Sequence, residues 1–121
     1  MPVINGLPTQ GGGKWELLWT NPSPNASFSP RTLNIDLTPY EYFVVECKAT
    51  TTSVGYQYNI VSINTTWEYI CMACGGTYDV RSCTFTDSSI TIANAQWSPS
   101  ATVNNEHIIP LNIYGVKKLN L

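Results

Sequence analysis

The sequence predicts a single all-β domain, an antiparallel β-sandwich with a jelly-roll-like arrangement of about eight strands. Three observations predict this fold. Short segments with alternating apolar and polar residues recur along the chain, as expected of strands with one buried face. Prolines, glycines and small polar residues separate these segments at intervals of about 8 to 12 residues. Apolar residues do not recur at the spacing of an amphipathic helix.

The chain is expected to begin with a flexible lead-in. Residues 1–13 contain two prolines and four glycines, three of them consecutive, and ordering such a segment is costly in backbone entropy. We therefore expect one domain, the sandwich, to occupy residues 14–121.

The first half of this domain is predicted to contribute four strands, at residues 15–20, 31–37, 40–49 and 56–63. A proline-rich segment ends the first strand, because proline cannot donate to a ladder. The second alternates strictly, with its leucines and isoleucine on one face. In the third, the side chains expected to face the core are Phe43, Val45 and Cys47.

The second half is predicted to contribute four more strands, at residues 66–74, 77–86, 90–97 and 107–118. Gly75-Gly76 is the clearest hairpin signal in the chain, since a two-residue turn favours glycine. Residues 98–106 are expected to form a loop before the last strand.

The low charge of the chain bears on its partners. Charged residues make up 12% of the chain and its net charge is -2, which suits a domain inside a larger assembly better than a free monomer. Of the six basic residues, only Lys117 and Lys118 are adjacent, so a basic face for nucleic acid is not expected. No apolar run is long enough to insert into a membrane. No signal peptide opens the sequence, so we expect synthesis in a cytosol.

The four cysteines are expected to be buried, reduced thiols. Cys71 and Cys74 have the spacing of half a zinc site, but Cys47, Cys83 and His107 are scattered along the sequence and no second pair of this kind exists. In a strand, Cys71 and Cys74 would also point to opposite faces. No metal or cofactor is therefore expected. A disulfide from Cys83 to Cys74 or to Cys47 is the alternative.

No catalytic residues are predicted, so the chain is expected not to be an enzyme. His107 is the only histidine, and no serine lies in the context of a nucleophile elbow. A glycosidase needs two close carboxylates, and none of the eight acidic residues stands out as half of such a pair.

The aromatic residues are the candidates for ligand binding. The chain has four tryptophans and seven tyrosines, more than a core of this size requires. The candidate binding residues are Trp19, Tyr56, Tyr58, Trp67 and Trp97. Such side chains stack on sugars and anchor subunit interfaces, and they also fill cores. The sequence leaves these roles open.

Three segments resemble a known family. They are GLPTQGGGKWELLWTNPSPNASFSPRTLNIDLTPYEYFVVE near the start, DVRSCTF in the centre and HIIPLNIYGVKK near the end. Together they are similar to small proteins and C-terminal modules of phage and prophage tails, and the likeness spans most of residues 6–118. The shared residues are structural, and the four cysteines depart from the usual pattern.

The resemblance implies a non-enzymatic part of a tail fibre or baseplate, with other tail proteins as partners. It further implies a homo-oligomer, with a trimer favoured, located in the virion tail or in the host cytoplasm during assembly. A cell-surface polysaccharide is a possible ligand. The alternatives are a free-standing carbohydrate-binding module and, with less support, a small glycan hydrolase.

Overall fold

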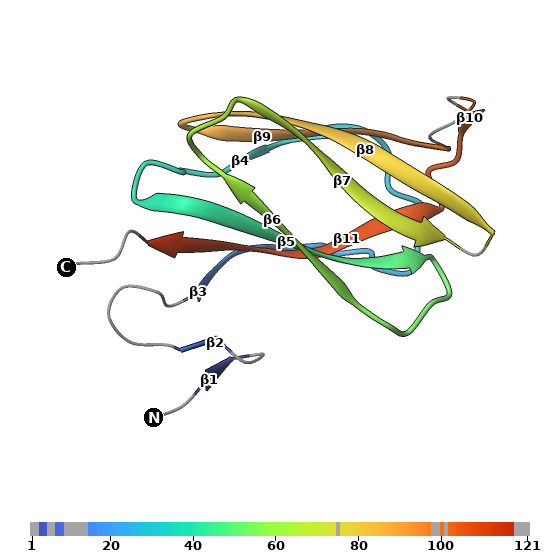
Figure 1. Cartoon of the computed structure of the whole chain (residues 1–121), viewed down its shortest axis with the longest axis horizontal. Coiled ribbons are helices and arrows are strands. Elements are labelled where there is room, and N and C mark those ends of the chain that lie inside the picture. The colour runs from blue at the N-terminus through green and yellow to red at the C-terminus, as the bar shows by residue number, and fades with distance from the viewer. Residues whose placement is uncertain are drawn as a thin grey trace.

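Two antiparallel sheets form the protein, as the computed structural model shows (Figure 1). The structure describes residues 3–4, 7–8, 15–74, 76–97, 100 and 102–117. The first sheet has the order β3-β11-β5-β6. Its strands are β3 (Trp15–Thr20), β11 (His107–Lys117), β5 (Tyr40–Thr50) and β6 (Gln57–Ser62).

The second sheet has the order β10-β9-β8-β7, and β4 also pairs with β9. Its strands are β10 (Thr102–Val103), β9 (Ser89–Trp97), β8 (Thr77–Thr86), β7 (Trp67–Cys74) and β4 (Arg31–Asn34). The two sheets face each other as two layers in Figure 1, so the predicted antiparallel β-sandwich is confirmed. The described residues contain no helix that is long and apolar enough to cross a membrane.

The core lies between the inward faces of the two sheets, as the alternation predicts. Phe43, Val45 and Cys47 on β5 are fully buried there. The second sheet contributes Ile70, Met72, Cys83, Phe85, Ile90 and Ile92 to the same cluster. Because side chains alternate along a strand, the intervening residues lie on the outer faces of the sandwich.

The predicted strands differ from the observed ones by more than one residue in three places, and the other strand ends agree within one residue. β4 ends at Asn34, although Ile35 and Leu37 keep the expected burial. β10 lies within the predicted loop 98–106. Part of the predicted lead-in, residues 1–13, lies outside the described residues, and the described part contains a short antiparallel pair, β1 (Val3–Ile4) and β2 (Leu7–Pro8).

β11 is irregular, and its irregularities shape the functional region. Its pairing with β5 shifts between Pro110 and Asn112, which is consistent with the preference of proline for bulges. Ile108 has φ 48°, a left-handed conformation that a β-branched residue adopts at a cost. The start of β11 therefore departs from an ideal strand beside the end of the β7–β8 hairpin.

A buried arginine ties the two layers together. Arg81 on β8 is fully buried, and its guanidinium donates to the backbone oxygens of Ile108 (2.8 Å), Ala93 (2.8 Å) and Phe28 (3.0 Å). It also donates to the oxygen of His107 at 3.0 Å. Burial lowers the pKa of Arg81 to about 10. Its side chain thus joins β8 to β9, to β11 and to the loop after β3.

Candidate functional site

The five candidate aromatic residues do not form one surface. Tyr56 and Tyr58 lie at the outer face of the first sheet, where Tyr56 is 64% exposed and Tyr58 contacts Glu46. Trp67 lies on the outer face of the second sheet, beside Tyr69. Trp97 ends β9 and is exposed. Trp19 packs against the core, with its ring 6.1 Å from that of Phe28.

A pocket on the outer face of the first sheet combines aromatic rings with polar groups. It has a volume of about 370 Å³. Its described lining consists of Thr20, Asn21, Pro24, Glu46, Tyr56, Leu111, Asn112 and Tyr114. We call it the Glu46 pocket. Of the predicted aromatic residues, only Tyr56 belongs to this described lining.

Hydrogen bonds hold the carboxylate of Glu46 in a fixed orientation. Asn112 Nδ2 donates to Oε1 at 2.7 Å and the Tyr58 hydroxyl donates to Oε2 at 3.1 Å. The Tyr114 hydroxyl lies 3.4 Å from Oε1. Burial, and then the negative charge of Glu46, raise the pKa of Tyr114, so this hydroxyl stays a donor. The pocket therefore presents a preorganised anionic acceptor.

Residues of β3 support the side chains that hold Glu46. The Trp15 ring lies 5.4 Å from each of the rings of Tyr58 and Tyr114, and the Thr20 hydroxyl donates to Asn112 Oδ1 at 2.9 Å. These contacts fix the side chains that in turn hold Glu46. Sequence reasoning missed Glu46 and Asn112 because their proximity depends on the pairing of β5 with β11.

A smaller groove lies on the outer face of the second sheet. Trp67 and Tyr69 form an edge-to-face pair there, with ring centroids 4.6 Å apart. Other described residues of this groove are Ser82, Ala93, Asn94 and Gln96. Its volume is about 300 Å³. The pairing of β8 with β9 shifts between Arg81 and Cys83, and the groove lies at this shift.

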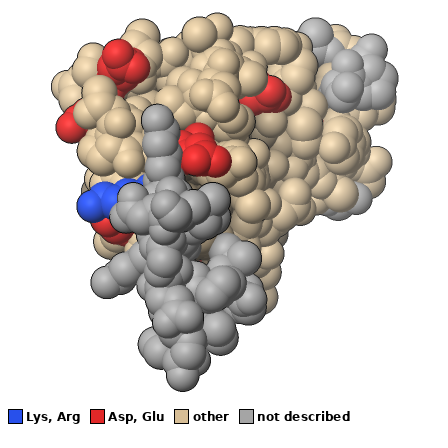
Figure 2. All heavy atoms as spheres, turned by 60° about the vertical axis from the view of Figure 1, so that its left-hand side comes forward, with Lys and Arg blue, Asp and Glu red and all other residues tan. Residues whose placement is uncertain are grey.

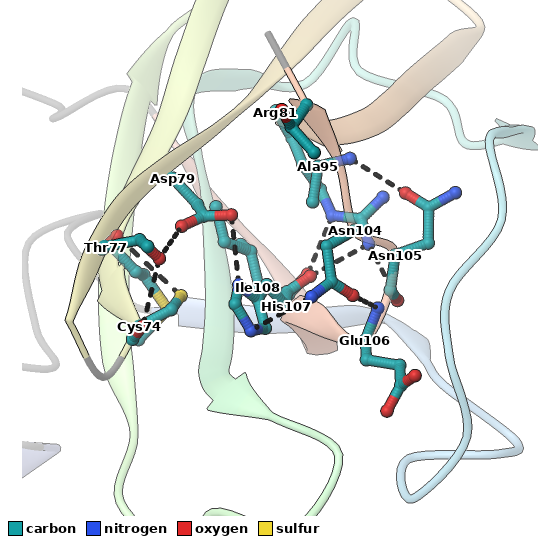
Figure 3. Close-up of polar contacts among 12 residues, drawn as sticks. Cys74, Thr77, Asp79, Arg81, Ala95, Asn104, Asn105, Glu106, His107 and Ile108 are labelled. Carbon is teal, nitrogen blue, oxygen red and sulfur yellow. Dashed lines mark hydrogen bonds and ion pairs between the residues drawn. The ribbon is translucent and has the colours of Figure 1, made fainter. Parts of the chain in front are cut away.

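A second kind of site lies at the end of the β7–β8 hairpin, next to the start of β11. Cys74, Asp79 and His107 each place one potential ligand atom there, and these atoms lie within 4.8 Å of one another (Figure 3). His107 Nδ1 lies 3.0 Å from Asp79 Oδ2. The Thr77 hydroxyl donates to the other oxygen of Asp79, and Asn104 Nδ2 lies 3.3 Å from His107 Nε2.

The local structure explains why these three side chains meet. The pairing of β7 with β8 ends at Cys74 and Thr77, so the two strands form a hairpin, as the sequence predicts; Gly75 lies outside the described residues. Cys74 and Asp79 both face the interior. His107 is the first residue of β11 and lies against them. Cys71 is on the opposite face of β7 from Cys74, as expected from its position in the strand.

This cluster was not predictable from local patterns in the sequence. Asp79 and His107 are 28 residues apart and belong to different sheets. The cysteines and the histidine are far apart in the sequence, as noted above. The fold nevertheless brings one of the cysteines, Cys74, close to His107. All four cysteines are free thiols. Cys47, Cys74 and Cys83 are buried as predicted, whereas Cys71 is only partly buried, because it lies on the outer face of β7.

Comparisons of the chain with protein-family models, with curated proteins and with solved structures find no match. The resemblance to phage tail modules therefore stays a prediction from the sequence, and the functional argument depends on the geometry of the sites.

Proposed function

We propose that this chain is a non-enzymatic recognition module of a phage or prophage tail, and that its Glu46 pocket binds cell-surface polysaccharide. The observation that carries the binding part is the combination of an exposed aromatic ring, Tyr56, with a fixed carboxylate in one pocket. An aromatic ring can cover the apolar face of a sugar, while the carboxylate accepts hydrogen bonds from its hydroxyls.

The polar groups of the pocket are suited to a neutral, hydroxyl-rich ligand. Glu46 accepts three hydrogen bonds from protein donors, and a carboxylate has about four acceptor positions. One position is thus left for a ligand hydroxyl. Because Asn112 is held between Thr20 and Glu46, little side-chain entropy is lost when a ligand binds.

Binding is favoured over glycan hydrolysis by the number of carboxylates. Glu46 is the one acidic residue in the described lining of the pocket, whereas glycosidases of the common mechanisms use a pair. A single carboxylate that is already held by three protein donors supports recognition better than acid–base chemistry.

The surface supports a place in an assembly of identical chains. The face in Figure 2 is mostly uncharged, with acidic side chains scattered across it. Leu17 and Ile60 on the first sheet are 59% and 63% exposed, and such residues are common at subunit contacts. The proposed oligomer is a trimer, located in the virion tail or in the host cytoplasm during assembly, with other tail proteins as partners.

The binding proposal is tested by screening the protein against a panel of bacterial polysaccharides. Tyr56→Ala and Glu46→Gln are expected to weaken binding about ten-fold or more. The first removes the ring that would cover the sugar, and the second removes the charged acceptor for its hydroxyls. Trp67→Ala is the matched control, since it removes an exposed aromatic residue from the opposite face. An empty screen would overturn the binding proposal, and loss of binding in Trp67→Ala alone would assign it to the other groove.

A free-standing carbohydrate-binding module is the second candidate, because the exposed ring of Tyr56 and the carboxylate of Glu46 would serve glycan binding equally in a free module. Light scattering on the same sample separates the two candidates. A trimeric mass supports the tail module. A monomer at high concentration that still binds glycan would support the free-standing module.

A further inference from the structure

The cluster of Cys74, Asp79 and His107 has a composition and a location that the glycan pocket does not explain. It lies at the end of the β7–β8 hairpin, between the two sheets. Cys74 and Asp79 are 3% and 1% exposed, and the side chain of His107 is 20% exposed. The cluster is thus closed on the side of the core and open on the side of the histidine.

We propose that Cys74, Asp79 and His107 bind a zinc-class divalent cation, which links the β7–β8 hairpin to β11. The three side chains supply sulfur, nitrogen and oxygen. Thiolate and imidazole together select zinc and related transition metals, whereas calcium and magnesium prefer sites made of oxygen alone.

The distances between the three ligand atoms are compatible with a tetrahedral site if the atoms move slightly closer together. Metal–ligand bonds of the usual lengths place neighbouring ligand atoms about 3.3 to 3.6 Å apart around a tetrahedral zinc ion. The corresponding atoms here lie within 4.8 Å of one another. Each ligand residue lies at or near the end of a strand, so a closure of about 1 Å does not require the sheets to move.

A neighbouring side chain already orients one of the ligands, Asp79. Thr77 donates to Asp79 Oδ1 and leaves Oδ2 directed at His107. Outer contacts of this kind are typical of metal sites, where they fix the ligand orientation. Asn104 Nδ2 lies 3.3 Å from Nε2 of the imidazole; because an amide nitrogen only donates, this contact belongs to the metal-free state and is exchanged for water when the imidazole binds metal through Nδ1. Figure 3 shows these side chains converging from β7, β8 and the start of β11.

The charge balance also favours a cation. A buried carboxylate is costly unless a positive charge compensates it. Among the described residues, the salt-bridge partner of Asp79 is His107, which carries a charge only when protonated. Arg81 lies on the same strand but donates to backbone carbonyls of other segments. A divalent cation at this position would place a positive charge directly beside the buried carboxyl group of Asp79.

Binding of the metal ion releases the proton of the Cys74 thiol. The Cys74 thiol loses its proton to solvent as the sulfur–metal bond forms, and the imidazole binds as the neutral base. Three protein ligands leave a fourth position for water on the open side, next to His107. The S–H bond of Cys74 is exchanged for the sulfur–metal bond, and the hydrogen bond between His107 and Asp79 is exchanged for bonds from both side chains to the metal. No oxidant or reductant is required.

The test is a titration of the full chain, freed of metal with a chelator, with Co²⁺ alone. Wild-type protein is expected to bind one equivalent and to show a thiolate-to-cobalt charge-transfer band that Zn²⁺ abolishes. Cys74→Ser removes the sulfur ligand, so the band is expected to disappear. Cys71→Ser is the matched control, because this thiol is on the opposite face of the same strand, and it is expected to keep the band.

The other two ligands are tested by affinity. Asp79→Asn and His107→Gln are expected to weaken cobalt binding at least ten-fold. Zn²⁺ is expected to raise the melting temperature of the wild type and of Cys71→Ser, since a ligand that binds only the folded state stabilises it. The same addition is expected to leave the melting temperature of Cys74→Ser unchanged.

Two results would overturn the site. One is the lack of a thiolate band in the wild type at stoichiometric Co²⁺, which would leave the cluster as a histidine–carboxylate ion pair beside an inert thiol. The other is a band that survives in Cys74→Ser. If that variant fails to fold, the wild-type titration and His107→Gln still decide the question.

Discussion

At the scale of single residues, Gly115 shows how close packing constrains a position that alternation alone leaves open. A Cβ atom at this position would lie 2.6 Å from the ring of Tyr40. That ring is held in place, because the Tyr40 hydroxyl donates to Glu16 Oε1 at 2.9 Å. Burial is the main cause that raises the pKa of Tyr40 to about 12, so the hydroxyl remains a donor at neutral pH.

Gly115→Ala is therefore expected to lower the free energy of unfolding by about 1–3 kcal/mol, the usual cost of overpacking. Chemical denaturation measures this change. Gly76→Ala is the matched control, since nothing lies within 4 Å of its added methyl group, and we expect it to stay within about 0.5 kcal/mol of the wild type. In a Tyr40→Ala background the cost of Gly115→Ala should shrink. Equal costs in both backgrounds would show that the ring is not the cause.

Residue-scale features were only partly predictable from the sequence. Alternation placed Phe43, Val45 and Cys47 in the core, and their full burial confirms it. The same pattern could not indicate that Gly115 faces Tyr40, or that Asp79 meets His107. These pairs join distant segments, and their contact depends on which strands become neighbours.

At the scale of elements, the edge of β7 is protected by side chains of β6. β7 pairs with β8 along one edge. On its other side, Gln57 Nε2 donates to the Cys71 carbonyl at 3.0 Å, and the Cys71 amide donates to Asn59 Oδ1 at 3.4 Å. Two side-chain amides thus occupy the backbone N–H and C=O of Cys71 in the middle of an edge that could otherwise pair with another chain.

Asn59→Ala is expected to expose this edge. The Cys71 amide would lose its partner, and we expect the free energy of unfolding to fall by about 1 kcal/mol. Hydrogen exchange at the Cys71 amide should become faster, while Asn64→Ala, at an exposed turn residue, should leave it unchanged. Unchanged exchange in Asn59→Ala would mean that the backbone of β7 is protected in another way.

The strands were the part of the structure that could be predicted best from the sequence. Turn residues and alternation located the eight main strands, because those signals are local. The short β10 was missed, since two residues carry too little pattern, and its pairing with Gln96 and Trp97 depends on the loop that follows β9. The early end of β4 was missed as well, although Ile35 and Leu37 still donate backbone hydrogen bonds to Ser88 and Asp87.

At the scale of the whole molecule, Arg81 connects β8 to two segments with which β8 does not pair, the loop after β3 and the start of β11. Its donors reach the loop after β3 at Phe28, β9 at Ala93 and the start of β11 at Ile108. The guanidinium also lies 5.2 Å from the centre of the Phe28 ring. The position of His107, and so of the proposed cation site, depends on the same set of contacts, because Arg81 also holds the His107 carbonyl.

Arg81→Met is therefore expected to destabilise the sandwich by about 3 kcal/mol or more, since several buried carbonyls lose their donor at once. Arg31→Met is the matched control. Arg31 also lies over the Phe28 ring, 4.3 Å from its centre, but it is exposed, so we expect a loss of no more than about 1 kcal/mol. Denaturant unfolding measures both values. If Arg81 acts only as a local filler, Arg81→Met should leave amide exchange at Phe28 and Ile108 unchanged. If Arg81 links the two sheets, amide exchange at Phe28 and at Ile108 should become faster in the same variant, because the same guanidinium holds both backbone segments.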